Sequence, residues 1–388
     1  MSSRTIAGAA FAVLALGWVL VQAAGAGPFT IIDLGTLGGN ESCAFGVNEK
    51  AQVAGLAHIS TQADRAFLYS GSTPTNLGTL GGAQSTGTCI NASGQVGGVS
   101  FTSSDVQHAF LYNGSKMVDL NTLGGSQSSA LSINDSGQLV GWAYTAGNAE
   151  RHAFFYNGST MTDLGTLGGT DSVGRAINNS GQIAGYATNS GGATHAFRRT
   201  GATMADLGTL GGTNSYAYAI NAFGEVAGYS YTAGDAAQHA FLYNGSTMLD
   251  LGTLGGTNSR AWGIDDWGRV VGYAYTSGGD QHAFFYNGST MFDLNTLIDA
   301  GSGWTLTSAY GISKGGAIVG QGTIGGQSHA FLLTPEPATL ALLALGGLAV
   351  LRRKRRQDPP GHCARALPAK SLSVIGNVCR QTHVRSRT

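Results

Sequence analysis

The sequence predicts an all-β fold, a seven-bladed β-propeller of repeated units about 43 residues long. Three observations predict it. The same motifs return seven times along the chain at nearly constant spacing. Each repeat contains four short runs of β-forming residues separated by turn-forming residues, which is the content of one propeller blade. The repeat region also begins with only the fourth run and ends with only the third, so the N-terminal segment can complete the last unit and hide both sheet edges.

Three motifs define the repeats. The first is Asp-Leu-Gly-Thr-Leu-Gly-Gly with small variations, and it begins at Asp33, Asn76, Asp119, Asp163, Asp206, Asp250 and Asp293. The second resembles Ile-Asn-x-x-Gly-Gln-Val-x-Gly and begins at Val47, Ile90, Ile133, Ile177, Ile220, Ile264 and Ile312. The third resembles His-Ala-Phe-Leu-Tyr and begins at Arg65, His108, His152, His195, His239, His282 and His329. An open β-solenoid is the alternative, but it would need capping units, and none is visible.

One unit illustrates the expected elements. Asn134–Gly137 has Asn first and Gly fourth, which suits a type I turn, and Asn157-Gly158 favours a two-residue type I′ hairpin. Gly168-Gly169 is expected to release the chain to the next unit. The expected strands of this unit are 129–133, 138–144, 152–156 and 161–167.

Composition and charge exclude several classes of protein. Glycine accounts for 62 of 388 residues but does not recur at every third position, which excludes collagen. A hydrophobic share of 42 % excludes a disordered chain. Residues 27–351 hold ten Lys or Arg and twenty Asp or Glu, whereas residues 352–388 hold ten Lys or Arg and one acid. An acidic body without a basic stripe argues against nucleic acid as a partner.

The first 26 residues predict a secretory signal peptide. Arg4 precedes an apolar run over residues 6–21, and Ala24-Gly25-Ala26 fits the small-x-small rule for cleavage. A retained transmembrane anchor is the alternative, and in either case the repeat body over residues 27–334 is exported.

The region 335–356 has three consecutive parts, which are Pro335-Glu336-Pro337, an apolar segment 338–351, and the basic cluster Arg352, Arg353, Lys354, Arg355 and Arg356. As a helix, the apolar segment would be about 21 Å long, short of the roughly 30 Å hydrocarbon core. The basic cluster would stay cytoplasmic. We therefore expect a short transmembrane helix that holds the body at the membrane before processing, with a plain tail anchor as the alternative.

This layout resembles the PEP-CTERM sorting signal of Gram-negative bacteria, and the seven motif copies over residues 31–333 resemble the HAF repeats of bacterial extracellular proteins. The first resemblance implies export by the secretion machinery, recognition by an exosortase (a membrane protease-transpeptidase), and delivery to the surface of cells that make exopolysaccharide. Such signals usually end soon after the basic cluster, whereas residues 357–388 continue here. That tail carries Cys363 and Cys379 at a spacing typical of no zinc or redox motif, and it is assigned no function.

Recurring histidines and aspartates are the first candidates for chemistry. In each expected hairpin they lie opposite one another, as in His108/Asp119, His152/Asp163, His195/Asp206, His239/Asp250 and His282/Asp293. They could form metal ligands or acid–base pairs, but a catalytic group is normally unique, whereas these recur in nearly every unit. We therefore predict structural pairs that bond across the hairpin. No catalytic residue, metal site or cofactor is predicted, since the sequence holds no Gly-x-Ser-x-Gly elbow, phosphate-binding loop or His-Glu-x-x-His motif.

Glycines and aromatic residues also recur in register. The glycines are expected where strands approach closely near the crowded axis, at Gly55, Gly98, Gly141, Gly185, Gly228, Gly272 and Gly320. Aromatic pairs follow several of them, at Trp142 and Tyr144, Tyr229 and Tyr231, and Tyr273 and Tyr275. We expect these pairs to fill the space between units, with stacking on sugar rings as the alternative.

Acidic loop residues and two cysteines complete the candidates. The acids precede the third strand at Asp64, Asp105, Glu150, Asp235 and Asp280, without the ligand spacing of a calcium site, so we expect a solvated rim. Cys43 and Cys89 lie at different offsets in adjacent units, which argues against a disulfide between them.

Two functions remain from the sequence. The favoured hypothesis is an exported surface or matrix protein that binds exopolysaccharide or forms part of its layer. The alternative is a glycan lyase or hydrolase with a site at the propeller mouth. Its residues would have to be among those that deviate from the repeat, namely Arg198, Arg199, Asp265, Asp266, Trp267 and Trp304.

Overall fold

The computed structural model describes residues 27–336, and they form an all-β structure. The strands nearest the centre are β2 (Gly38–Val47), β6 (Gly81–Ile90), β10 (Gly124–Ile133), β14 (Gly168–Ile177), β18 (Gly211–Ile220), β22 (Gly255–Ile264) and β26 (Trp304–Ile312). The second strands are β3 (Val53–Ile59), β7 (Val96–Thr102), β11 (Leu139–Thr145), β15 (Ile183–Asn189), β19 (Val226–Thr232), β23 (Val270–Thr276) and β27 (Ile318–Ile324).

The third strands are β4 (Asp64–Tyr69), β8 (Gln107–Tyr112), β12 (Arg151–Tyr156), β16 (Thr194–Thr200), β20 (Gln238–Tyr243), β24 (Gln281–Tyr286) and β28 (Gln327–Pro335). The fourth are β5 (Thr75–Asn76), β9 (Met117–Asp119), β13 (Met161–Asp163), β17 (Thr203–Asp206), β21 (Met248–Asp250), β25 (Met291–Asp293) and β1 (Phe29–Asp33). Short 3-10 helices lie at η1 (Ala146–Asn148), η2 (Ala233–Asp235), η3 (Leu294–Leu297) and η4 (Ala300–Ser302).

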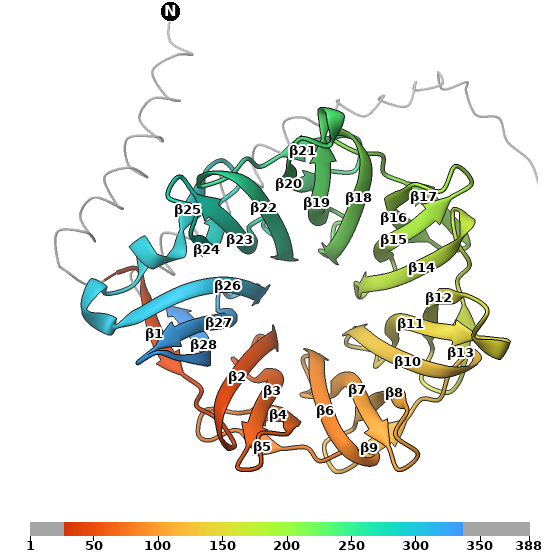
Figure 1. Ribbon diagram of the computed structural model, residues 1–388, viewed down its shortest axis with the longest axis horizontal. Helices are drawn as coiled ribbons and strands as arrows, with labels where there is room; N and C mark the ends of the chain where they lie inside the picture. The colour runs from red at the N-terminus through yellow and green to blue at the C-terminus, as the bar shows by residue number, and fades with distance from the viewer. Residues whose placement is uncertain (1–26, 337–388) are drawn as a thin grey trace, which may run out of the picture. The chain divides into compact units, whose positions relative to one another are not determined.

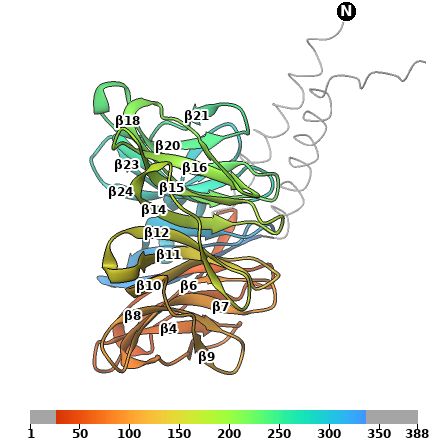
Figure 2. The ribbon, with the colours of Figure 1, turned by 90° about the vertical axis from the view of Figure 1, so that its right-hand side faces the viewer.

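The strands pair into sheets that radiate from the centre of the molecule (Figure 1). Five sheets have four strands, and one has eight because a single parallel pair, Arg151 with Asp171, joins its two four-stranded halves. The pairing does not run on into one closed sheet. In the side view the sheets follow one another in chain order, face against face (Figure 2). The prediction of an all-β fold is confirmed.

The N-terminal strand belongs to the last sheet, whose order is β1-β28-β27-β26. β1 and β28 are antiparallel, with Phe29 opposite Pro335 and Asp33 opposite Phe331. The N-terminal segment therefore completes the last unit as predicted, but with residues 29–33 rather than 33–37. The strand ends at Asp33 because its carboxylate accepts the Gly35 N–H at 2.8 Å and turns the chain.

The same turn shortens every fourth strand. In the unit used as the example, the strand is Met161–Asp163 and not 161–167, since Asp163 Oδ1 accepts the Gly165 N–H at 2.7 Å and Gly165 has a φ of +71°. The Gly168-Gly169 pair was expected to release the chain, and that expectation is wrong. It begins the next central strand, β14.

The two predicted turns differ in outcome. At Asn134–Gly137 the Gly137 N–H donates to the Asn134 carbonyl at 3.0 Å, and the prediction of a β-turn there is confirmed. At Asn157-Gly158 the type I′ prediction is wrong, because Gly158 and Ser159 occupy the turn and only Gly158 has a positive φ. Asn157 instead accepts the Ser159 and Thr160 N–H groups with its side chain.

The hydrophobic core lies between neighbouring sheets. Ala66 of the first sheet packs with Val96 and Phe110 of the next. The first and last sheets meet in the same way, with Phe67 and Leu332 in one buried cluster. Backbone N–H groups also bond to the buried serine of the following sheet at 2.8–2.9 Å, in the pairs Ala66–Ser85, Ala109–Ser128, Ala153–Ser172, Ala196–Ser215, Ala240–Ser259 and Ala330–Ser42.

Each recurring glycine lies where two neighbouring strands of one sheet approach each other closely. A Cβ on Gly141 would lie 1.9 Å from the Ser129 carbonyl oxygen and 2.8 Å from the Phe154 ring. The corresponding glycines in the other sheets meet the same carbonyl at 1.9–2.1 Å. The close approach was predicted, but the crowding comes from the neighbouring strand of the same sheet rather than from the axis.

Candidate functional site

A β-bulge in each central strand sets the candidate site. In β10 the register with β11 shifts between Ala130 and Ser132, so that Leu131 is the extra residue. The same shift occurs at the same place in all seven central strands. We call the extra residues the bulge residues, and they are Phe45, Thr88, Leu131, Arg175, Tyr218, Trp262 and Tyr310.

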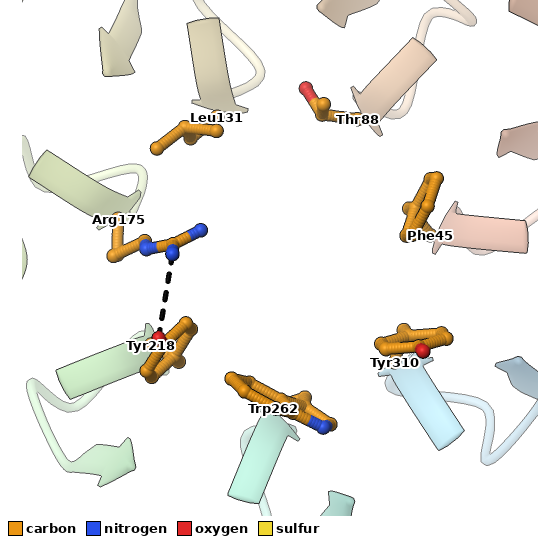
Figure 3. A pocket seen from close by; sticks show the side chains of 7 residues that line it. All are labelled: Phe45, Thr88, Leu131, Arg175, Tyr218, Trp262 and Tyr310. Atoms are coloured by element: carbon orange, nitrogen blue, oxygen red, sulfur yellow. Dashed lines mark hydrogen bonds between the residues drawn. The ribbon is translucent and has the colours of Figure 1, made fainter. Parts of the chain in front are cut away.

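The bulge residues line one cavity of about 350 Å³, each from a different central strand (Figure 3). That volume lies in the range of small-molecule sites. The seven positions hold six different residue types. The position two residues earlier varies as widely, and it holds Cys43, Thr86, Ser129, Val173, Tyr216, Arg260 and Ser308. Bulges commonly redirect a side chain at a functional site, which is what they do here.

The two sides of the cavity differ in chemistry. Thr88 and Leu131 form a small side, whereas Arg175, Tyr218 and Trp262 form a cationic and aromatic side (Figure 3). Behind the latter, Tyr229 stacks on Tyr218 with ring centroids 5.8 Å apart. Arg260 lies over the Tyr229 ring at 4.4 Å. We call Arg175, Tyr218, Tyr229, Arg260 and Trp262 the arginine–aromatic wall.

Tyr218 is the centre of this wall. Its ring lies 4.3 Å from the Arg175 guanidinium and 4.3 Å from the Trp262 ring centroid. Burial raises the pKa of the Tyr218 hydroxyl, while the charges of Arg175 and Arg260 both act to lower it. Both arginines therefore act on the same hydroxyl. Burial also raises the pKa of Tyr310, across the cavity, to about 12.

The predicted aromatic pairs are thus partly in the wall and partly elsewhere. Tyr229 belongs to it, and Tyr273 lies 6.0 Å from the Arg260 guanidinium. Trp142 and Tyr144 pack edge to face at 5.8 Å, and Arg151 lies over Trp142. Sequence reasoning missed the bulge residues, and the signal that could have found them is their variation within an otherwise regular repeat.

A second cavity, of about 370 Å³, is lined by the turns that follow the central strands. A belt of hydrogen bonds joins neighbouring turns there. Asparagine Nδ2 donates to the backbone oxygen of the next turn at 2.9–3.3 Å, in the pairs Asn48–Asn91, Asn91–Asn134, Asn134–Asn178, Asn178–Asn221 and Asn221–Asp265. Because these donors are used in the belt, they are not available to a ligand.

Asp265 and Arg269 replace the asparagine–glutamine pair that most other turns carry. Both side chains are almost fully buried and form an ion pair, and Arg269 lies over the Trp267 ring at 4.6 Å. Asp265 lacks the amide N–H that an asparagine would donate to the next turn. Arg269 Nη2 makes that hydrogen bond instead, to the Lys314 carbonyl at 3.1 Å. Burial raises the pKa of Asp265, while Arg269 opposes the shift. These two residues continue the belt.

Asp266 also lines the second cavity and accepts the Ala222 N–H at 2.9 Å. Arg198 donates to the Gly224 carbonyl at 2.9 Å and lies over Tyr243, and Trp304 packs edge to face on Phe331. Arg199 pairs with Met204 between β16 and β17. The structure therefore brings Asp265, Asp266 and Trp267 together in one turn, and the other three candidates lie elsewhere.

The structure places each repeated histidine beside its aspartate. The separations between histidine Nδ1 and a carboxylate oxygen are 2.6–2.8 Å for His108–Asp119, His152–Asp163, His195–Asp206, His239–Asp250 and His282–Asp293. His329 and Asp33 form the same pair at 2.9 Å between the last strand and the first. In each case the aspartate also accepts a backbone N–H two residues on, so the pair fixes the hairpin and the turn together.

The described part of the chain contains neither a cluster of potential metal ligands nor a disulfide. Among residues 27–336 no three His, Cys, Asp or Glu side chains gather to hold a metal ion. Cys43 and Cys89 are buried and unpaired, and burial raises the pKa of the Cys89 thiol to about 12. Over the same range no helix is long and apolar enough to cross a membrane.

The beginning of the expected sorting signal is part of the folded body. Pro335 ends β28, and the Glu336 N–H donates to the Pro28 carbonyl at 3.0 Å. Thr30 Oγ1 donates to the Glu336 carboxylate. The predicted cleavage residues Ala24 and Ala26, Pro337, the apolar segment 338–351, the basic cluster 352–356 and the tail lie outside the described residues.

Comparison with known proteins supports the C-terminal signal directly. Residues 333–356 match the family model of the PEP-CTERM protein-sorting motif. This confirms the predicted sorting motif, and such signals mark exported proteins that exosortases sort to the surface. No curated protein sequence gives a significant match.

Solved structures match the fold at low identity. A puromycin-hydrolyzing peptidase of Mycobacterium tuberculosis is 13 % identical, with a TM-score of 0.52, and the match covers 78 % of this chain and 52 % of that one. TolB of Acinetobacter baumannii is 12 % identical, with a TM-score of 0.43 and coverage of 74 % and 64 %. Trypanosoma rangeli sialidase is 10 % identical, with a TM-score of 0.40 and coverage of 88 % and 65 %. This chain thus spans between half and two thirds of these proteins. The match to the peptidase, with its TM-score above 0.5, concerns the fold alone and supports a propeller-like arrangement.

Proposed function

We propose that this chain is an exosortase-sorted surface protein whose body, a seven-bladed β-propeller of HAF-type repeats, binds exopolysaccharide without catalysing a reaction. The N-terminal signal directs export, the apolar segment 338–351 holds the protein at the membrane, and processing then delivers it to the surface. The PEP-CTERM match over residues 333–356 supports this surface location.

The observation that carries the binding role is the cavity of bulge residues. Its aromatic side chains present flat apolar faces, and the C–H faces of pyranose rings are complementary to such surfaces. Binding sites commonly combine aromatic walls with a few polar groups that orient the ligand. A repeated scaffold with a few varied positions per unit is suited to recognition, because the scaffold holds the varied side chains rigidly.

The experiment is binding of the full chain, purified in mild detergent, to the polysaccharide secreted by its own host. We expect saturable binding that falls at least about tenfold when Tyr218 and Trp262 are both changed to alanine. Tyr156→Ala is the matched control, since Tyr156 lies in an outer strand and its hydroxyl donates to the Gly158 carbonyl. Binding that is absent, or equal in both variants, would count against the proposal.

The proposed processing and surface location are tested separately, by measuring the intact mass of the protein from the host envelope and medium. We expect a product that begins at Gly27 and ends near Pro335. A product that retains residues 338–388 would instead indicate a membrane-tethered protein that is not processed.

A further inference from the structure

The arginine–aromatic wall carries two cations, Arg175 and Arg260, which form no ion pair among the described residues. Arg65 and Arg199 form none either, so the lack of a counter-ion does not by itself distinguish the wall. The position of Arg175 does, because it lines the cavity, where a cation attracts a ligand of opposite charge.

The contacts of the two arginines leave donors free. Arg175 makes one hydrogen bond, to the Tyr218 hydroxyl at 3.4 Å, and its Nε has no partner within the described structure (Figure 3). Arg260 gives both its hydrogen bonds to Gln238 Oε1, a neutral acceptor. A guanidinium has five N–H donors in a planar fork that fits a carboxylate.

Trp262 contributes its ring to the cavity wall. Its indole Nε1 is buried without a hydrogen-bond partner in the described structure, but it lies at the end of the ring that points away from the cavity centre (Figure 3). Trp262 therefore offers an aromatic surface rather than a donor. The adjacent Tyr218 hydroxyl keeps its proton, because burial raises its pKa.

Arg175, Tyr218 and Trp262 come from three consecutive central strands, β14, β18 and β22. Phe45 and Tyr310 lie opposite Arg175 and Tyr218, so aromatic rings line both sides of the cavity while the cation lies on one side (Figure 3). A ring can therefore lie against the aromatic faces while its substituent reaches an arginine. Leu131 on the small side adjoins Arg175 and brings no acceptor to it (Figure 3).

From these contacts we infer that the arginine–aromatic wall binds a carboxylate-bearing sugar, a uronic acid residue of an acidic polysaccharide. The sugar ring stacks on Trp262, because Arg175 and Tyr229 already cover the Tyr218 ring, and the carboxylate is held by Arg175, with Arg260 contributing charge from behind Tyr229. This inference rests on the proposed polysaccharide binding and specifies the chemistry of the ligand.

The test compares two probes of equal length, tetragalacturonate and neutral maltotetraose, by isothermal titration on the full chain in mild detergent. We expect tetragalacturonate to bind at least about tenfold more tightly, and the preference to fall at least about tenfold in Arg175→Gln. Arg260→Gln should weaken the preference by a smaller factor. Arg198→Gln is the matched control, because Arg198 also lies over a tyrosine but outside the cavity.

A second variant keeps the test independent of any arginine substitution. Leu131→Glu places a carboxylate beside Arg175, and it should abolish the preference for the acidic probe. Each variant is first checked for an unchanged thermal midpoint.

The outcomes separate the two proposals. Equal binding of both probes overturns the inference while sugar binding itself stands. Binding of neither probe, together with no binding of the host polysaccharide, overturns both. A preference for tetragalacturonate that persists in both Arg175→Gln and Leu131→Glu also overturns the inference, because the carboxylate of the probe would then bind at another place.

Discussion

The glycine and the bulge residue of each repeat lie on neighbouring strands, but they follow opposite rules. The glycine is the same in all seven repeats because a Cβ there would overlap a carbonyl oxygen at 1.9–2.1 Å. The bulge residue changes in nearly every repeat, and it faces a cavity, so that no backbone atom of a neighbouring strand restricts its size as at the glycine. Identity in a repeat protein thus marks positions fixed by packing, and variation can mark the positions that contact a ligand.

The largest effect should come from adding one methyl group at the invariant position. Gly141→Ala places Cβ 1.9 Å from the Ser129 carbonyl, so we expect a loss of more than about 3 kcal/mol in the free energy of unfolding, or no folded product. Urea denaturation measures it. Gly147→Ala is the control, with a positive φ but nothing within 4 Å, and should cost about 1 kcal/mol. Equal costs would show that close packing does not fix Gly141.

The next effect concerns the repeat in which an ion pair, Asp265 with Arg269, replaces the asparagine–glutamine pair. Arg269→Met leaves the buried Asp265 carboxylate without its cation and should cost about 3 kcal/mol. The double variant Asp265→Asn/Arg269→Gln restores the pair found at Asn134 and Gln138, and we expect it to recover most of that loss in urea denaturation. A double variant as unstable as Arg269→Met would mean that the two pairs are not interchangeable.

Asp265 also predicts a dependence on pH. Because burial raises its pKa in the folded state, the folded protein holds this proton more tightly than the unfolded chain does. The stability that this group contributes is complete below the ordinary Asp pKa and is lost as the pH rises through the raised value. Relative to the double variant, the wild-type protein should therefore become less stable as the pH increases from about 3 through that range. If the wild-type protein instead gained stability relative to the double variant as the pH rises, the raised pKa of Asp265 would be contradicted.

A smaller effect is expected at the histidine–aspartate pairs. His152→Gln removes a partly exposed pair in one sheet and should cost about 1 kcal/mol, since such pairs contribute modestly. The same substitution at His239 should cost a similar amount, because the pair has the same geometry. Thermal unfolding of both variants measures this. A large loss of sugar binding in either would assign the pairs a functional role instead.

The smallest effect on stability should come from the bulge residues. Leu131→Thr introduces the residue that another repeat already carries at Thr88, and we expect a change within about 0.5 kcal/mol. A loss as large as that of Gly141→Ala would show that bulge residues are also constrained by packing, and would remove the contrast between the two positions.

Much of the fold could be predicted because turns and strands have local signals. The Asn134–Gly137 turn, the strand runs and the opposition of histidine and aspartate all follow from residue types at short spacing. The bulge could not be predicted from the sequence, because Ala130-Leu131-Ser132 has the composition of a regular strand. The shift in register arises only when this strand pairs with β11. The end of the fourth strand was missed because the Asp163 side chain competes with the ladder for a backbone N–H.

The pairing of β1 with β28 has a consequence for how the protein reaches its folded state. Asp33 and His329 are separated by 296 residues, so the contact between them is among the least local in the chain. Such a contact carries a large loop-closure cost and forms slowly. During export β1 leaves the membrane first, and nearly the whole body must follow before β1 can pair with β28. Until then one strand edge stays open, and the exported chain depends on protection from aggregation for the duration of its own translocation.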